Sequence, residues 1–561
     1  MNEEAVKQLT KQGCMVEKDA AESISKEDVE LIEQLDVTPM FVSRKMVENL
    51  REKMETSVST GNNGVKTVQK QKMAVKQGEG TSTTETEPEE IQEHEETVSQ
   101  EKDAEESPNT QTSSEETTEP APETSEEMSK DLEEEFETKS SYFDKNKTVE
   151  IKDTGSRDEK DTKVEIMDEK QITQEEKDVP EFLGYYNDRY DKMKKLLTRR
   201  QEMKSATTIN RLEGRSEGEE ATTIGFVNDK YSTNSGKYIV ELEDKTGTFK
   251  ALVDEREGDR LVPDEVIGVS GSMGGDIIYA NSVIRPDLPI PQGTNSTQDK
   301  VQAAYISDLH MGSQDTLHKR LDRFGDWLST EEAKHIGYLV MPGDLVEGVG
   351  VYPGQKEELE VEDIYKQYQL FEEWFQKIPE DIQVIVGPGN HEITRLAEPQ
   401  PRLPKKVFPD IDDYNNFHRV QNPQMVRLHA IRSKGIKNLM YHGYSFDDHV
   451  DKIQDLREKA YEEPHHVMID LLKRRHLAPT YGDNMLSPEM EDQLVIEEQP
   501  DVMVSGHFHS HANTTYKGVN VINSSTFQAQ TDFQKRMGHE PDPGKVTIVD
   551  YKTRKTQVKQ F

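Results

Sequence analysis

Five short apolar runs in the C-terminal half of the chain each end in a cluster of polar residues, and this repeated pattern constrains the fold most strongly. Stretches with helical spacing separate the runs, for example at 317–334 and 361–378. Strands that alternate with helices build layered α/β folds, in which ligands gather at the carboxyl ends of the strands. We therefore expect a layered α/β domain over residues 300–561, with its functional site where the strands end.

The five clusters read SDLHMG, MPGDLVEG, GPGNHE, MYHGYS and SGHFHS. Their polar members are Asp308, His310, Asp344, Asn390, His391, His442, His507 and His509. A single Asp-x-His or Gly-Asn-His is typical of a turn or of a core histidine, but five such pieces after five predicted strands are hard to obtain by chance. Carboxylate, amide and imidazole groups without cysteine suit Mn²⁺, Fe or Zn²⁺ and argue against a thiolate-held structural zinc.

The combined motif resembles that of the calcineurin-like metallophosphoesterases over residues 300–550. A narrower resemblance is to the small subunits of archaeal family-D DNA polymerases, whose phosphoesterase domain is similar to that of a double-strand-break repair nuclease. Three stretches carry it: GPGNHEITRLAEPQPRLP, YHGYSFDD and INSSTFQAQTDFQKRMGHEPDPGKVTIVDY. The resemblance covers 180–561 by sequence and the first 180 residues only by their arrangement.

The resemblance implies a centre with two divalent metal ions, with Mn²⁺ favoured over Mg²⁺, Fe or Zn²⁺. It assigns one ion to Asp308, His310, Asp344 and His509, and the other to Asp344, Asn390, His442 and His507. Asp344 would bridge the two ions, and His391 would be the catalytic histidine. The third histidine of SGHFHSHANT, His511, is then not needed as a ligand, and the Gly-His-x-His unit is expected on a loop rather than on a strand.

Three neighbouring positions carry weaker expectations. Glu392 stands where many relatives have Asp. Asp447 and Asp448 follow His442 and are candidates for orienting it. Arg395 either contacts a DNA phosphate or forms a structural salt bridge.

The function implied is that of the small subunit of a heteromeric replicative polymerase. It would remove single-stranded or mismatched 3′ ends as a 3′→5′ exonuclease and serve as a scaffold for a large catalytic subunit. DNA is the expected substrate, and the N-terminal region is a candidate site for a sliding clamp or primase. Two alternatives remain open at this point: a free-standing metallophosphatase and a non-catalytic polymerase scaffold.

The N-terminal half divides into three parts. Residues 1–56 show helical spacing after a capping-box start and predict a small helical domain. Residues 57–178 are rich in Glu, Thr, Ser and Lys and predict a disordered acidic linker. Over 180–295, a basic helix with aromatic residues precedes about five short alternating runs separated by turn signals, which predicts a small OB-like β-barrel.

Net charge and cysteine content bear on DNA binding and on the compartment in which the protein works. The net charge is −40, and residues 81–180 alone hold 34 acidic against 11 basic residues. An acidic chain is unusual for a DNA-binding protein, so contact with DNA would depend on a metal centre and a local basic groove. The single Cys14, the absence of an apolar run long enough to span a membrane and the absence of an apolar leader predict a cytoplasmic protein.

Overall fold

The structure is a computed structural model of the chain. It describes residues 161–172, 177, 179–482 and 484–561, together with short pieces at 15–16, 24–26 and 41–42. The chain divides into two units, Met1–Glu119 and Pro120–Phe561. In the first unit, β1 (Met15–Val16) pairs in parallel with β2 (Phe41–Val42). Nearly all of the predicted 1–56 helical domain and most of the predicted 57–178 linker lie outside the described residues.

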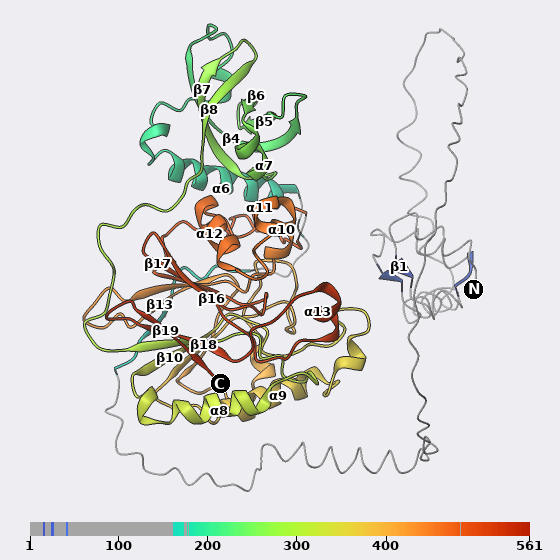
Figure 1. The fold of residues 1–561 in the computed structure, drawn as a ribbon, viewed down its shortest axis with the longest axis vertical. Helices are drawn as coiled ribbons and strands as arrows, with labels where there is room; N and C mark the ends of the chain where they lie inside the picture. Colours follow the sequence, from blue (N-terminus) through green and yellow to red (C-terminus); the bar gives the residue numbers. More distant parts are fainter. Residues whose placement is uncertain are drawn as a thin grey trace, which may run out of the picture. The chain divides into compact units, whose positions relative to one another are not determined.

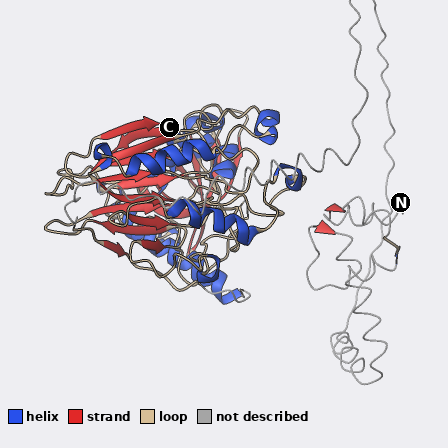
Figure 2. Cartoon of the chain, turned by 90° about the horizontal axis from the view of Figure 1, so that it is seen from below, coloured by secondary structure: helices blue, strands red, loops and turns tan. Residues whose placement is uncertain are grey.

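Two six-stranded sheets lie at the centre of the C-terminal domain (Figures 1 and 2). The first has the order β12 (Phe417–Arg419), β11 (Gln383–Val386), β10 (Ile336–Met341), β9 (Gln302–Tyr305), β18 (Lys545–Asp550) and β19 (Thr556–Gln560). The second has the order β16 (Ala512–Tyr516), β17 (Val519–Asn523), β15 (Val502–Ser505), β14 (Ile436–Met440), β13 (Gln424–Leu428) and β3 (Val164–Ile166). Strands β9 to β12 are mutually parallel, and so are β14, β15 and β17.

Alternation of side chains along the strands divides the core into layers. On β10, Tyr338 and Val340 pack between the two sheets, whereas Leu339 and Met341 pack under helices α8 (His318–Leu328) and α9 (Ile364–Phe375). The second sheet is covered in the same way by α10 (Phe446–Lys452), α11 (Gln454–Arg457) and α12 (His465–Arg474). Figure 1 shows α8 and α9 on one side of the strands and α10 to α12 on the other, so the predicted α/β layers are confirmed as helix, sheet, sheet and helix.

A closed five-stranded barrel precedes this domain, as the alternating runs predicted. Its strands are β4 (Glu220–Ser232), β5 (Tyr238–Asp244), β6 (Gly247–Val253), β7 (Val266–Met273) and β8 (Ile277–Ile284), in the order β4-β5-β6-β8-β7. Helix α7 (Glu255–Arg260) connects β6 to β7. The predicted basic helix is α6 (Val179–Leu197), and its buried Tyr190 and Met193 pack against Ile224 and Val266 of the barrel.

The predicted linker does not continue unbroken to residue 178. Strand β3 pairs antiparallel with β13 at the edge of the second sheet. Its Val164 and Ile166 pack against the core between the sheets, and the backbone N–H of Lys163 donates to the hydroxyl of Tyr338 at 2.9 Å. Three residues that alternate apolar and polar are enough for an edge strand when a preformed sheet supplies the partner, but they are too few to stand out in an acidic sequence.

Buried ion pairs fix the barrel and α6 on the two-sheet domain. The guanidinium of Arg189 on α6 is 1% exposed and lies 2.6 Å from the carboxylate of Asp492. It also donates to the carbonyls of Pro479 and Asp264. Arg474 on α12 pairs with Asp470 and with Glu265 of the barrel.

Every helix among the described residues is too short or too polar to span a membrane.

The Arg189–Asp492 pair predicts a large stability effect. Replacing Arg189 by Ala leaves the buried carboxylate of Asp492 with His476 as its remaining ionisable contact, and breaking a buried pair costs about 3–5 kcal/mol. Denaturant unfolding measures the change, and Lys245→Ala, which removes an exposed pair with Asp191, is the control and should change the unfolding free energy by about 1 kcal/mol or less. Equal effects of the two substitutions would contradict this role of Arg189.

Candidate metal centre

The carboxyl ends of five strands bring the eight residues of the sequence motifs together. Asp308 and His310 follow β9, Asp344 follows β10, and Asn390 and His391 follow β11. His442 follows β14, and His507 and His509 follow β15. The parallel pairing places the ends of β9 to β11 at one edge of the first sheet and the ends of β14 and β15 at one edge of the second. Contacts of His442 with Asp344 and of His509 with Asp308 show that these two edges meet.

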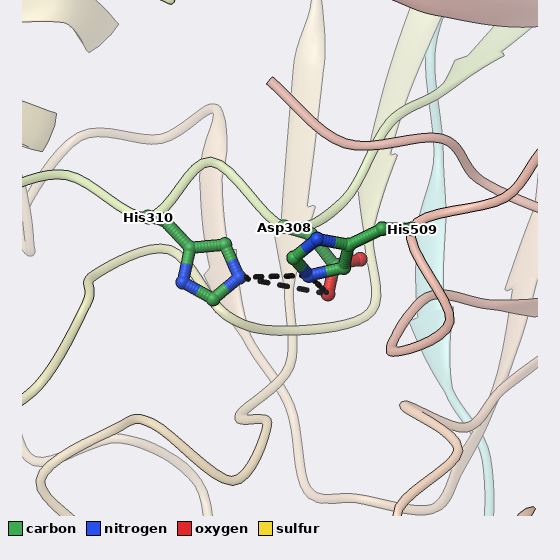
Figure 3. Close-up of side chains that lie close together, drawn as sticks. All are labelled: Asp308, His310 and His509. Atoms are coloured by element: carbon green, nitrogen blue, oxygen red, sulfur yellow. Dashed lines mark hydrogen bonds and ion pairs between the residues drawn. The ribbon is translucent and has the colours of Figure 1, made fainter. Parts of the chain in front are cut away.

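One group of donors consists of Asp308, His310 and His509 (Figure 3). The Nε2 atoms of the two histidines lie 3.0 Å apart. The carboxylate Oδ1 of Asp308 lies 3.4 Å from Nε2 of His509 and 4.0 Å from Nε2 of His310. All three side chains are buried, so three polar groups converge on one point that solvent barely reaches.

A second group consists of Asp344, His442 and His507, with Asn390 beside them. Nε2 of His442 lies 3.1 Å from Oδ2 of Asp344 and 2.9 Å from Oδ1 of Asn390. Nδ1 of His442 is buried and has no hydrogen-bond partner within the described part of the chain. The ring of His507 lies 5.3 Å from that of His442, centroid to centroid.

Asp344 lies between the two groups. Its Oδ2 is 3.9 Å from Nε2 of His310 in the first group and 3.1 Å from Nε2 of His442 in the second. Its Oδ1 accepts the backbone N–H of His391 at 3.0 Å. The bridging position that the family resemblance implied is therefore available to this carboxylate.

The backbone is left-handed at five of the eight positions. The φ values of Asp308, His310, Asp344, His507 and His509 are 55°, 49°, 51°, 71° and 55°. Non-glycine residues in this region cost of order 1–3 kcal/mol each and cluster at functional sites. The strain indicates that the side-chain positions, rather than backbone preference, determine the course of these loops.

Two glycines permit the loops to approach this closely. A Cβ on Gly506 would lie 2.1 Å from Oδ2 of Asp308, and one on Gly389 would lie 2.2 Å from Oδ1 of Asp344. Any other residue at either position would displace a carboxylate of the centre.

Glu347 orients His310, and the sequence motifs did not reveal it. Its Oε2 lies 2.8 Å from Nδ1 of His310, which turns Nε2 toward Asp308 and His509. Tyr352 and Gln528 donate to the same carboxylate. A carboxylate behind a histidine is a common support of metal ligands. The only sequence signal is an acidic residue three positions after Asp344.

Asp447 and Glu392 also support the centre. Oδ2 of Asp447 lies 2.8 Å from Nε2 of His507, so this aspartate contacts His507 and not His442, which had been the expected partner. The buried carboxylate of Glu392 accepts the backbone N–H groups of Gly389 and Asp344 at 2.6 and 3.2 Å. The longer side chain in place of Asp thus ties the loops after β10 and β11 together.

Pairs of carboxylates and histidines dominate the electrostatics of the centre. Burial by itself would lower the pKa of His310, but Glu347, Asp344 and Asp308 raise it to about 9. Burial would raise the pKa of Glu347, but His310 lowers it to about 2. The cluster of carboxylates thus favours positive charge at its centre.

Three expectations concern single residues. His511 is on the loop before β16 and its Nε2 bonds to the hydroxyl of Thr547, so it lies outside both groups. His391 belongs neither to the group that contains Asp308 nor to the group that contains Asp344. Its Nδ1 lies 2.6 Å from the carbonyl oxygen of Glu347. Arg395 donates to the carbonyls of Ala397 and Pro399 and pairs with Glu489, which favours the structural alternative over a DNA contact.

Comparison with known proteins identifies the family. The family model that describes the B subunits of DNA polymerases alpha and epsilon matches residues 303–514. A DNA polymerase II small subunit from Archaeoglobus fulgidus is 39% identical over 385 residues, which cover 66% of this chain and 75% of that protein. The chain belongs to the archaeal DNA polymerase II small subunits. All eight motif residues of this small subunit fall within the matched range.

Further relatives match this chain with similar sequence identity and coverage. The DNA polymerase II small subunits of Methanothermobacter thermautotrophicus and Halobacterium salinarum are each 38% identical, and the matches cover 66% and 68% of this chain and 78% and 75% of those proteins. Among solved structures, a novel archaeal phosphodiesterase is 14% identical with a TM-score of 0.23, and the match covers 46% of this chain and 100% of that one. That structural likeness is too weak to bear on fold or activity.

The contact between Glu347 and His310 predicts a titration change in the metal-free small subunit. Glu347→Gln removes the largest influence that raises the pKa of His310, so this pKa should fall below about 9. NMR of histidine-labelled protein measures it. Glu358→Gln is the matched control, because Glu358 shares the Tyr352 hydroxyl with Glu347 but makes no such contact with His310. An unchanged titration of His310 in Glu347→Gln would contradict the assignment.

Proposed function

We propose that this small subunit is a 3′→5′ exonuclease that uses two divalent metal ions to remove nucleotides from single-stranded or mismatched DNA ends. The observation that carries the proposal is the position of Asp344 between two groups of buried donors. One carboxylate shared by two cations, roughly 3.5–4 Å apart, is the arrangement of two-metal phosphoesterases.

The donor set fits two such ions. Glu347 engages Nδ1 of His310, so the lone pair of Nε2 is directed at the point where His509 and Asp308 converge. Asp447 engages Nε2 of His507 and leaves Nδ1 for the second group. We assign Asp308, His310, Asp344 and His509 to one ion, and Asp344, Asn390, His442 and His507 to the other. Oxygen and nitrogen donors without sulfur favour Mn²⁺, with Mg²⁺, Fe and Zn²⁺ as further candidates.

When bound, such ions polarise a phosphodiester and supply a hydroxide nucleophile near neutral pH. The protein's own contribution is orientation and proton transfer. Nδ1 of His391 must carry a proton, because the carbonyl of Glu347 can only accept a hydrogen bond. Nε2 lies on the other side of the ring, so a proton bound there, in the doubly protonated imidazolium, is the one that can pass to the leaving 3′-oxygen and leave a neutral ring protonated at Nδ1.

The partner of this activity is a large catalytic polymerase subunit, for which the barrel and the two-sheet domain would also be a scaffold. Membership in the small-subunit family supports this pairing. Contact with a sliding clamp or primase through the N-terminal region stays a prediction, since that region lies almost wholly outside the described residues. A free-standing metallophosphatase is disfavoured by the family, and a purely non-catalytic scaffold by the complete donor set.

His391→Ala tests the proposed chemistry. Loss of the proton donor should lower the rate of Mn²⁺-dependent shortening of 3′-mismatched DNA by about 10²–10⁴-fold, while bound Mn²⁺ is retained. His511→Ala, a neighbour of the ligands that bonds to Thr547, is the control and should keep the wild-type rate. A non-catalytic scaffold predicts no Mn²⁺-dependent shortening by the wild type at all, and an undiminished rate in His391→Ala would remove His391 from the mechanism.

Asp344→Asn tests the bridge. A shared ligand predicts loss of both ions, so calorimetric titration should give no tightly bound Mn²⁺ where the wild type binds two. Asn390→Ala, which touches only the second group, should lose one ion and keep the other. Loss of a single ion in Asp344→Asn would show that the two groups are separate sites.

A further inference from the structure

An exposed aromatic side chain lies beside the candidate metal centre and has no part in the chemistry described so far. Phe533 is 51% exposed on α13 (Asp532–Met537; Figure 1), in the stretch TDFQKRMGHEPDPG. The next residue, Gln534, places Nε2 2.8 Å from Nδ1 of His509. Phe533 is therefore adjacent in sequence to a residue that contacts a donor of the first group.

Helix α13 holds this position firmly. Thr531 and Gln534 form a capping box, in which each side chain bonds to the backbone N–H of the other. Gly538 ends the helix with a left-handed backbone. Gln534 thus serves both the helix start and His509, so the helix cannot shift without disturbing the centre.

A second ring connects Phe533 to the proposed catalytic histidine. The ring of Tyr352 lies 6.2 Å from that of Phe533, with 31° between the planes, and 6.3 Å from that of His391. The hydroxyl of Tyr352 bonds to Glu347 and Glu358, which fixes its ring. The rings of Phe533, Tyr352 and His391 therefore form a continuous series from the surface to the centre.

The surface around Phe533 combines apolar and cationic groups. Arg536 and Met537 follow Phe533 by three and four positions and so share its face of the helix. Met537 is 58% exposed, and Val349, in the loop that also carries Tyr352, is 48% exposed. Nε of Arg536 donates to the carbonyl of Asp532, and the guanidinium also interacts electrostatically with the exposed carboxylate of that residue. A flat apolar ring beside an exposed cation suits a nucleobase joined to a phosphate.

We propose that Phe533, backed by Tyr352, stacks on the 3′-terminal nucleobase of the DNA strand, and that Arg536 approaches the adjoining phosphate. This inference rests on the proposed exonuclease function and adds a basis for its selectivity. In this proposal the terminal base leaves its partner strand to stack on Phe533. Unpairing costs least at a mismatched or single-stranded end, so those ends are held best.

The contact can be tested by the fluorescence of a DNA strand that carries 2-aminopurine as its 3′-terminal base. The full-length protein is used with EDTA, which removes divalent metal ions, so that the strand is bound but not cleaved. Stacking quenches this fluorophore, so the wild type and Phe533→Trp should quench it. Phe533→Ala should leave the fluorescence largely unquenched at saturating protein. Tyr414→Ala is the matched control: Tyr414 is 45% exposed and lies just before β12, at the opposite edge of the sheet, so it should quench as the wild type does. Equal quenching by wild type and Phe533→Ala would overturn the proposal.

Steady-state kinetics with Mn²⁺ provide the second measurement. Loss of base–aromatic stacking weakens binding of the strand, so Phe533→Ala should raise KM for single-stranded DNA by about tenfold, with kcat changed much less. On a strand whose 3′-terminal residue is abasic, wild type and Phe533→Ala should have equal KM. An unchanged KM on normal DNA in an active enzyme overturns the role of Phe533. A wild type that quenches 2-aminopurine but never cleaves DNA overturns the exonuclease function and leaves the stacking contact in place.

Discussion

The rest of the site depends on the position of Asp344 between the two groups of donors. Its carbonyl accepts the backbone N–H groups of Leu309 and His310 at 2.8 and 3.2 Å, its carboxylate accepts that of His391, and its Oδ2 lies 3.1 Å from the ring of His442. One residue thus joins the loops that follow β9, β10, β11 and β14. The fifth loop joins through Asp308, whose carboxylate accepts the N–H of His507 at 3.0 Å.

This convergence explains features that would otherwise be unfavourable. Left-handed backbone at five non-glycine residues and a concentration of buried carboxylates both cost free energy. The cost is tolerable because two sheets with a shared core hold the strand ends at fixed separations, and because Glu392 cross-links two of the loops through backbone N–H groups. Bound cations would offset much of the remaining repulsion between the carboxylates. The same rigidity extends to α13 through Gln534, which places an exposed aromatic ring at a defined distance from the centre.

Much of this arrangement could be predicted from the sequence, because strand-end motifs report both the fold and the site. Short apolar runs followed by Asp, His or Asn indicated parallel strands and their converging ends, and turn signals indicated the barrel. The supporting residues could not be predicted in the same way. Glu347 and Asp447 contact ligands from other loops, and their partners depend on how those loops meet. Strand β3 was missed because a three-residue edge strand depends on a distant partner, β13, and not on its own composition.

The most direct test of the account is a crystal structure of the protein soaked with Mn²⁺, with the ions located by anomalous scattering. The account predicts two peaks, roughly 3.5–4 Å apart, with the carboxylate of Asp344 between them. One peak should lie among Asp308, His310 and His509, and the other beside Asn390, His442 and His507. A single peak, or two peaks that do not share Asp344, would contradict the account.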